Sequence, residues 1–421
     1  MSASTGPTSS ELSWEQARAV ARKAAGSPLP AVRSPLAEAL GHALAEPLTA
    51  LTDLPAFDTS AMDGWAVAGP GPWRLLADRV LAGARPVPLA PGTAVPIATG
   101  AQVPPGASAV LRREHGEAAG RMLRTAPPAA GAPAAGAPSV VPPSPASPSV
   151  VPPGQDIRPR GQECRTGEPL LPAGATVTPA VLGLAAAAGC DRLAVHRRPT
   201  VELLLLGDEL LSSGVPGDGR VRDALGPLLP PWLHRCGAEV TAVHRVPDDP
   251  DALAAALTAR TADVLLTTGS TAAGPADHLH RALAATGARL LVDSVAVRPG
   301  HPMLLAELPP AATGRARHLV GLPGNPLAAV AGTVTLAAPL LRRLGGHPDG
   351  AAGRAVPAAT ALPGHPRSTR LLPVWLTAAG AVPVAYDGPA MLRGLALADG
   401  LAAVPPGGLP AGAPTEVLAT P

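Results

Sequence analysis

The sequence is poor in aromatic residues and in several common polar residues. Phe, Trp and Tyr make up 2% of its 421 residues, so any hydrophobic core must consist mainly of Ala, Val and Leu. The chain has one Lys, one Asn and one Phe, which are Lys23, Asn325 and Phe57. Ala, Arg, Gly and Pro have displaced other residues widely, so a rare residue that persists points to a position where its chemistry is needed. This argument selects the segments around Asn325 and Phe57.

Other absences exclude whole classes of protein. The three cysteines, Cys164, Cys190 and Cys236, form no CxxC, no zinc-type spacing and no even disulfide framework, which predicts reduced thiols in the cytoplasm. A net charge of +2 without a basic block gives no indication of nucleic-acid binding. The polar N-terminus lacks the pattern of a signal peptide, and the apolar stretch 327–341 is too short and too interrupted to cross a membrane. We therefore expect a cytoplasmic protein.

The length and the distribution of Gly and Pro predict several domains. A chain of 421 residues exceeds one ordinary domain, so two to four are expected. The 46 Gly and 55 Pro fall just short of the content that indicates disorder throughout. They concentrate in residues 126–154, where SVVPP occurs twice, and this segment is predicted to be a flexible insertion that packs no core.

The stretch DVLLTTGSTAAGPAD, residues 263–277, has the layout of a ligand crevice. Its apolar run predicts a short strand buried on both faces. The strand ends at Gly269, where the backbone can approach an anion closely, and Ser270 and Thr271 add hydroxyl groups. Asp277 then opens the next helical pattern, where its carboxylate could face a metal ion. Such crevices lie at the carboxyl ends of parallel strands, although many similar turns bind nothing.

The first part of the chain combines helices, a polar loop and short strands. Ser13 opens a capping box and a helix, and a second short helix is predicted within residues 35–44. Residues 53–67 are predicted to form a loop between strands, with four ligand-type side chains whose close spacing favours a ligand loop over turn formation alone. These are Asp58, Thr59, Ser60 and Asp63. Residues 73–114 predict a small β-domain, which contains a second Thr-Gly pair at Thr99. Beyond the insertion, Arg158 and Arg160 are either surface charges or part of an anion site.

From about residue 199 strands and helices alternate, which predicts a mostly parallel sheet covered on both faces. Strands are expected at residues 201–206, Glu239–Val246, 290–297 and just before Pro323. Helices are expected from Asp223, Pro250 and Asp277 onward, and a long amphipathic helix from Pro326 to Leu344 with Asn325 as its cap. Residues 354–421 return to short β runs and predict a second β-domain.

Six motifs in this order resemble those of the molybdopterin molybdenumtransferase family, the MoeA-type proteins and the E domain of gephyrin. They are DTSAMDGWAV, IATGAQVPPGASAVLRRE, IRPRGQECRTGEPLL, GDEL, RPGHP and LPGNP. The resemblance implies an α/β plus β fold: an N-terminal helical and β region, an inserted β-domain, a three-layer α/β molybdopterin-binding domain and a C-terminal β-barrel-like domain. The implied boundaries are residues 1–198, 199–346 and 347–421.

The resemblance also implies an activity and an assembly. Family members insert molybdenum from molybdate into adenylylated molybdopterin and release AMP, with a divalent metal for which we expect Mg²⁺. They are elongated homodimers, and each site forms between the α/β domain of one subunit and the N-terminal region of the other. The expected partners are therefore a second copy of the chain and a molybdopterin-type ligand, without nucleic acid or membrane.

Matching the motifs residue by residue gives a set of candidate site residues. The implied catalytic residues are Asp63, Thr99 and Asp277, and the implied metal ligands are Glu209, Asp223 and Asp277. The implied substrate-binding residues are Gly269, Ser270, Thr271, Gly274, Pro299, Gly300, Pro302, Asn325 and Arg370. Arg298 and Arg367 could add positive charge for the anionic ligand.

The chain departs from the family at four positions next to these residues. The crevice turn, usually Gly-Gly-Val-Ser-Val-Gly-Asp, has Ala272 in place of a hydroxyl residue and Pro275 in place of a carboxylate. Leu225 stands where Asn is usual and His301 where Lys is usual. Three interpretations follow: a working molybdenum insertase, a non-catalytic paralogue that binds molybdopterin or a partner protein, or an enzyme for another nucleotide-type phosphate substrate.

Overall fold

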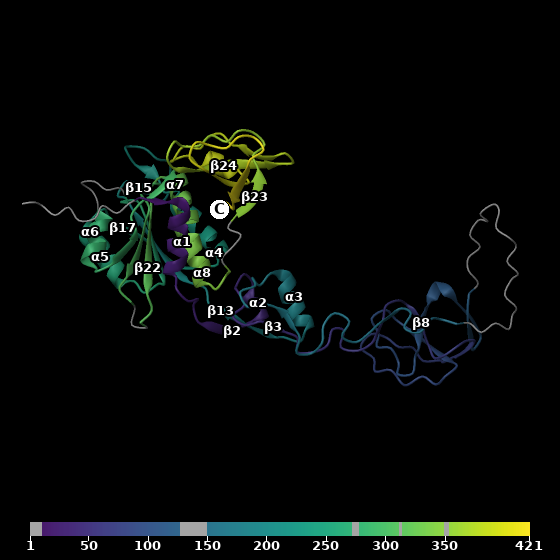
Figure 1. Cartoon of the computed structure of the whole chain (residues 1–421). Helices are drawn as coiled ribbons and strands as arrows, with labels where there is room; N and C mark the ends of the chain where they lie inside the picture. Colours follow the sequence, from purple (N-terminus) through teal and green to yellow (C-terminus); the bar gives the residue numbers. More distant parts are fainter. Residues whose placement is uncertain (1–10, 127–149, 272–277, 311–313, 349–352) are drawn as a thin grey trace, which may run out of the picture. The chain divides into compact units, whose positions relative to one another are not determined.

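The computed structural model describes residues 11–126, 150–271, 278–310, 314–348 and 353–421. The chain divides into two compact units (Figure 1). The first comprises Met1–Glu46, Ala173–Thr178 and Arg192–Pro421, and the second comprises Pro47–Pro172 and Pro179–Asp191. Segments far apart in the sequence therefore contribute to each unit.

A six-stranded sheet forms the centre of the first unit, in the order β17-β14-β18-β22-β21-β19. The strands are β14 (Thr200–Leu206), β17 (Glu239–Val246), β18 (Val264–Thr268), β19 (Arg289–Val292), β21 (Leu304–Leu308) and β22 (Arg317–Leu322). The first four strands in the sheet are parallel, while β21 is antiparallel to both of its neighbours. All five residues of β18 are buried, which confirms the predicted strand covered on both faces.

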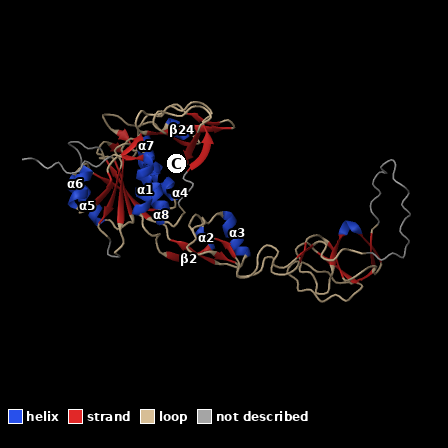
Figure 2. Ribbon diagram, in the orientation of Figure 1, coloured by secondary structure: helices blue, strands red, loops and turns tan. Residues whose placement is uncertain are grey.

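Helices cover both faces of this sheet (Figure 2). Within β14, Leu203 and Leu205 belong to the core on one face and Leu204 and Leu206 to the core on the other, as strand alternation requires. The first face packs against α1 (Trp14–Ala24), α4 (Leu225–Arg235) and the long helix that begins at Pro326. The second face packs against α5 (Pro250–Ala259) and α6 (His278–Ala285). The predicted capping box at Ser13 is present, and Asp249 caps the helix expected from Pro250.

The long helix runs from Pro326 to Leu344 as α7 (Pro326–Gly332), a π-helical turn η2 (Thr333–Ala337) and α8 (Ala338–Leu344). It was predicted to be amphipathic, but nearly all of its residues are buried. By length and composition its 19 residues could cross a membrane, which corrects the expectation that this stretch is too short. Because 83% of its most apolar window is buried inside the protein, it is the core helix of this unit.

The first unit also contains a second sheet of seven strands. Its order is β1-β20-β24-β26-β27-β23, with β25 beside β24. The strands are β1 (Leu12–Ser13), β20 (Val295–Arg298), β23 (Gly353–Pro357), β24 (Thr369–Thr377), β25 (Gly380–Pro383), β26 (Gly400–Val404) and β27 (Pro414–Leu418), with α9 (Arg393–Leu397) nearby. The single strand predicted at residues 290–297 is wrong, because β19 and β20 belong to different sheets.

Residues 35–44 do not form the predicted helix. Only α2 (Leu36–Ala39) is helical, because the preceding β2 (Ala31–Pro35) pairs with β13 (Arg192–His196) along five residues. This long-range pairing overrides the local helical pattern. The first unit also contains the two-stranded pair β15 (Leu210–Leu211) and β16 (Val221–Arg222).

The second unit is built around the predicted β-domain, a six-stranded sheet in the order β8-β5-β7-β6-β10-β9. Its strands are β5 (Gly64–Val67), β6 (Trp73–Leu75), β7 (Thr93–Ile97), β8 (Ala109–Arg112), β9 (Gly116–Ala119) and β10 (Met122–Thr125). The pairs β4 (Thr59–Ser60) with β11 (Ile157–Arg158) and β3 (Leu48–Thr49) with β12 (Pro169–Leu171), the turn η1 (Arg113–His115) and α3 (Pro179–Ala187) complete it. The predicted loop 53–67 therefore ends in a strand of this sheet.

Candidate functional site

The parallel sheet of the first unit has a crevice at its topological switch point. β14 comes first in the chain, and the next two strands, β17 and β18, lie on its opposite sides. The connections from the carboxyl ends of these strands diverge there, which is where α/β proteins bind small ligands. A cavity of about 550 Å³ lies at this place and is lined by five predicted site residues. They are Glu209, Asp223, Gly269, Ser270 and Asn325.

The turn after β18 leaves the crevice open. The Gly269 N–H donates to Leu322 O at 2.8 Å, so β22 holds the turn in place. Gly269 and Ser270 have φ angles of 93° and 51°, in the left-handed region that suits glycine. Gly324 lies opposite, where an added Cβ would come within 3.6 Å of the Gly269 Cα. Thr271 is buried beside this turn.

Four residues of the predicted turn and helix start lie outside the described residues. These are Ala272, Gly274, Pro275 and Asp277. Their predicted roles, including the metal and catalytic roles of Asp277, remain predictions.

The long helix begins at this cavity. Asn325 is its N-cap by backbone geometry, but the side chain makes no capping hydrogen bond. The exposed amide of Asn325 is therefore available to a ligand in the cavity. The N-terminal end of a helix carries partial positive charge, which favours an anionic group such as phosphate.

Both carboxylate oxygens of Asp223 have protein partners, so no metal ion is needed to satisfy them. Its Oδ1 accepts hydrogen bonds from the Leu225 and Gly226 N–H groups at 3.0 and 2.9 Å, which caps α4. Its Oδ2 lies 3.3 Å from Arg245 Nη2, which comes from the neighbouring β17. The residue is buried, so these contacts offset the cost of burying its charge. Leu225, where the family usually has Asn, is buried in the core instead.

The described residues do not by themselves form a site for a divalent cation. No group of three or more His, Cys, Asp or Glu side chains in the described part of the chain could hold one. Glu209 lines the cavity together with Asp248, and both side chains are exposed. The sequence interpretation missed Asp248 and Arg222 as lining residues. Asp248 could have been found, because it follows the carboxyl end of a predicted strand.

Asp63 and Thr99 form a direct pair in the second unit. Asp63 Oδ1 accepts hydrogen bonds from the Thr99 N–H at 2.6 Å and from Thr99 Oγ1 at 2.9 Å. These two bonds, with a smaller contribution from the charge of Arg113, lower the pKa of Asp63 below its usual value. Asp63 and Arg113 line a cavity of about 390 Å³ together with Asp78 and Arg79. At neutral pH Asp63 is therefore an ionised acceptor, not a proton donor.

The loop from Arg298 to Pro302 packs against the long helix. Gly300 has a φ of 102°, and a Cβ added there would lie 2.9 Å from Ala328 O. His301 Nδ1 lies 3.0 Å from Val295 O and 2.9 Å from a Glu11 carboxylate oxygen. The described residues that line the crevice cavity do not include Pro299, Gly300 or Pro302. The structure thus does not join this loop to the crevice cavity.

Two predicted arginines lie side by side where this loop begins. Arg298 on β20 is the register partner of Arg370 on the parallel strand β24. Arg370 Nη2 lies 2.5 Å from Asp387 Oδ2, which compensates its charge, and Arg298 Nη1 donates to the Val297 carbonyl at 3.3 Å.

In the second unit Arg160 Nε lies 2.5 Å from Asp53 Oδ2, so the structure favours an ion pair for Arg160.

The topology and the cavity define an α/β protein with a small-molecule crevice at its switch point. Family models match three successive parts of the chain: "MoeA N-terminal region (domain I and II)" at residues 12–189, "Probable molybdopterin binding domain" at 202–343, and "MoeA C-terminal region (domain IV)" at 355–420. The chain is 33% identical over 333 residues to a molybdopterin molybdenumtransferase of Synechococcus elongatus, covering 75% of each chain. The chain belongs to the molybdopterin molybdenumtransferase (MoeA) family.

Further relatives agree with this assignment. Molybdopterin molybdenumtransferase 2 of Mycobacterium tuberculosis is 33% identical over 386 residues, which cover 88% of this chain and 90% of the relative. The fold resembles the crystal structure of a molybdopterin biosynthesis MoeA protein from Pyrococcus horikoshii, with a TM-score of 0.72, 24% identity, and coverage of 97% and 99% of the two chains. The expected α/β plus β fold class is thereby confirmed.

Proposed function

We propose that this protein acts in molybdenum cofactor biosynthesis by inserting molybdenum from molybdate into adenylylated molybdopterin, with release of AMP. The observation that carries the proposal is the switch-point cavity lined by Gly269, Ser270 and Asn325, in a chain of this family. Relatives that carry the enzyme's name support catalysis over the non-catalytic interpretation. The four departures from the family motif do not remove these three residues.

In this proposal the crevice binds and orients the phosphate-bearing part of the substrate. The open turn at Gly269 admits an anionic group to close range, and the Ser270 hydroxyl and the Asn325 amide donate to its oxygens. The partial positive charge at the start of the long helix stabilises the same group. Binding of this kind positions the phosphate for the loss of AMP.

Asp63 would act as an ionised acceptor that its bonds to Thr99 hold in one orientation. A carboxylate of lowered pKa is a weak base, so we assign it a positioning role and not proton donation. Pro299, Gly300, Pro302 and Arg370 remain proposed substrate-binding residues by motif, with Arg298 as a second positive charge beside Arg370.

Mg²⁺ remains a proposal from the resemblance. When bound, Mg²⁺ neutralises phosphate charge. Glu209, Asp223 and Asp277 are the proposed ligands, but both oxygens of the Asp223 carboxylate already have partners and Asp277 lies outside the described residues.

A homodimer, a cytoplasmic location and functional divisions at residues 1–198, 199–346 and 347–421 complete the proposal. They follow from the resemblance and from the cysteine content. Light scattering at micromolar concentration tests the assembly, and a strict monomer would contradict both the dimer and a site shared between subunits.

Paired serine variants test the crevice. The Ser270→Ala variant should lose at least tenfold in AMP release from adenylylated molybdopterin in the presence of molybdate. The matched Ser213→Ala change, on an exposed loop that does not line the cavity, should leave it unchanged. In a strain that lacks its own molybdenum insertase, the Ser213→Ala protein should restore growth that depends on the cofactor. The Ser270→Ala protein should fail to restore it. If the parent protein neither releases AMP nor complements, the proposed activity is wrong.

A further inference from the structure

A basic pocket lies in the first unit, away from the crevice. Its volume is about 200 Å³, and α1, α4, α8 and the segment after β27 contribute to its lining. Four arginines line it, namely Arg18, Arg22, Arg235 and Arg342. Arg342 and Asn325 lie near opposite ends of the long helix, which places them about 25 Å apart at 1.5 Å per residue. The pocket is therefore separate from the proposed active site.

Arg18 is the residue that points to a ligand. It is only 6% exposed, and its Nη1 is buried without a hydrogen-bond partner. The guanidinium lies 4.5 Å from the ring centroid of Trp14, and its Nη2 is 3.9 Å from Glu416 Oε1, which is too far for a hydrogen bond. A buried charged donor without an acceptor costs substantial free energy. An anion in the pocket would supply the missing acceptor.

The pocket contains more positive than negative charge. For Arg22, Arg235 and Arg342 the described part of the chain shows no ion pair. The carboxylates of Glu416 and Glu15 act on Arg18, and Glu416 is the stronger of the two. Arg22 and Arg342 are half-buried, so solvent screens them less than fully exposed side chains. The charges of four arginines converge on a space that one small anion could fill.

The remaining walls suit a desolvated anion. Val334, Pro339 and Leu418 form an apolar side, and charge-assisted hydrogen bonds are stronger against such surfaces. Burial and the charge of Arg342 lower the pKa of His347 to about 4, so this imidazole is neutral at pH 7. Burial raises the pKa of the Cys236 thiol to about 11, so no thiolate competes with an anion.

We propose that this pocket binds a small doubly charged oxyanion of the phosphate class, with Arg18 and Arg342 as its principal donors. The anion is either free or the phosphoryl group of a monoester, since both present the same oxygens. Tetrahedral oxyanions accept several guanidinium hydrogen bonds at once, which matches converging arginines. This site is independent of the crevice and of the activity proposed for it.

A pair of neighbouring arginines on α8 provides the test. Titration calorimetry of the full chain with inorganic phosphate at low salt should show binding that the Arg342→Gln change weakens about tenfold, equivalent to about 1.4 kcal/mol. The matched Arg343→Gln change, one position along the helix and outside the pocket lining, should leave it unchanged. Phosphate bound in the crevice contributes equally to all three proteins. Equal affinity of the two variants, or no binding up to about 10 mM phosphate, would overturn the proposal.

Two further measurements keep the test decisive. The Arg18→Met change keeps an unbranched apolar side chain in place of the arginine stem but removes the guanidinium donors. Arg22→Gln on the half-buried rim serves if Arg18→Met does not fold. Either change should weaken phosphate binding at least fivefold, and an unchanged affinity contradicts the site. Phenyl phosphate separates the two sources of the anion: tighter binding than phosphate indicates a monoester, and equal binding indicates the free ion.

Discussion

Asp63 and Thr99 show what single residues can and cannot reveal. Each was selected from a different motif, and the structure places them in direct contact although 36 positions separate them. Their contact explains why both motifs contain the residue they do: the threonine supplies two donors to one carboxylate oxygen. The carboxylate is thus a fixed acceptor.

Removing one of these donors should raise the pKa of Asp63. In Thr99→Val the hydroxyl bond is lost while the backbone N–H bond remains, so we expect a partial return toward the ordinary Asp value. NMR titration of the Asp63 carboxyl measures the shift, and Thr125→Val, at the end of β10, is the control. A pKa that does not rise would show that the hydroxyl bond is not formed in solution.

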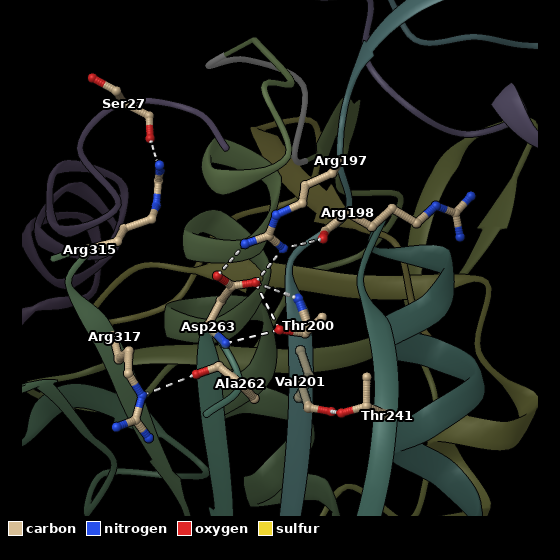
Figure 3. A network of polar contacts seen from close by, with 10 residues as sticks. All are labelled: Ser27, Arg197, Arg198, Thr200, Val201, Thr241, Ala262, Asp263, Arg315 and Arg317. Carbon is tan, nitrogen blue, oxygen red and sulfur yellow. Dashed lines mark hydrogen bonds and ion pairs between the residues drawn. The ribbon is translucent and has the colours of Figure 1, made fainter. Parts of the chain in front are cut away.

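Asp263 has a structural role at the amino-terminal ends of the parallel strands, opposite the crevice. It precedes β18 and pairs with Arg197, with Oδ2–Nη1 and Oδ1–Nη2 distances of 2.7 and 2.8 Å, and it accepts bonds from the Thr200 N–H and hydroxyl (Figure 3). Burial alone would raise the pKa of Asp263, but these bonds outweigh burial and lower it. Its position before the strand excludes it from the crevice.

Asp263 should stabilise the protein in a pH-dependent way. Its lowered pKa means that its contribution is fully present above the ordinary Asp pKa of 3.8 and is lost as pH falls through the lower folded value. At pH 7, Asp263→Asn should reduce the free energy of unfolding by about 2 kcal/mol, because the charge of Arg197 loses its partner. Urea denaturation at pH 7 and below pH 3 measures this, with exposed Asp191→Asn as control. An equal loss at both pH values would contradict the ion-pair account.

Residue identity alone could not separate the two roles considered for acidic residues at strand ends. Asp223 was a candidate metal ligand at the start of an expected helix, where a carboxylate can also act as a cap. The structure shows the cap, and it adds Arg245, which no local pattern could indicate because it arrives from β17. By contrast, Gly269, Ser270 and Asn325 were predictable as neighbours, because the carboxyl ends of parallel strands meet at one edge.

For helices and strands, the hydrophobic periodicity predicted that an element forms better than it predicted what surrounds the element. The long helix has the expected bounds, but all sides of its first two segments are buried. Its small residues Ala, Gly and Thr allow other elements to approach closely. The predicted strand 290–297 was divided between two sheets at Asp293 and Ser294. An alternating pattern contains no information on which sheet each half joins.

The contact between α1 and the long helix should be a measurable part of stability. Trp14 Nε1 donates to Thr335 Oγ1 at 3.0 Å, and the Thr335 hydroxyl donates to Ala331 O at 2.6 Å, with all three residues buried. Thr335→Val keeps the shape but leaves the indole N–H without an acceptor, so we expect a loss of about 2 kcal/mol. Chemical denaturation measures it, and Thr241→Val on the exposed side of β17 should cost less than about 0.5 kcal/mol. Equal costs would show that water replaces the lost acceptor.

For the whole molecule, the order of strands determines where the site can be. Motif order predicted the family, and the alternation of strands and helices predicted the parallel sheet. The strand order β17-β14-β18-β22 could not be read from the pattern, since it depends on which side of β14 each connection crosses. That order creates the switch point and so turns a common glycine turn into a crevice.

The low-complexity insertion should be dispensable for folding. Residues 126–154 were predicted to pack no core, but Val151 is buried in a core cluster with Trp73 and Leu123, so the prediction is wrong at that end of the segment. The composition of residues 127–149 still predicts that they bury little apolar surface. Before them, β10 has its own partners in β9 and β6. We expect replacement of residues 127–149 by a short Gly-Ser linker to shift the midpoint of thermal unfolding by less than about 3 °C, because a shorter loop changes closure entropy only slightly. Calorimetry of the two proteins measures this. The control replaces Leu123 with Ala, which should lower the midpoint clearly because the side chain is fully buried. A drop in the linker variant as large as that of the control would show that the insertion contributes to the packed core of the second unit.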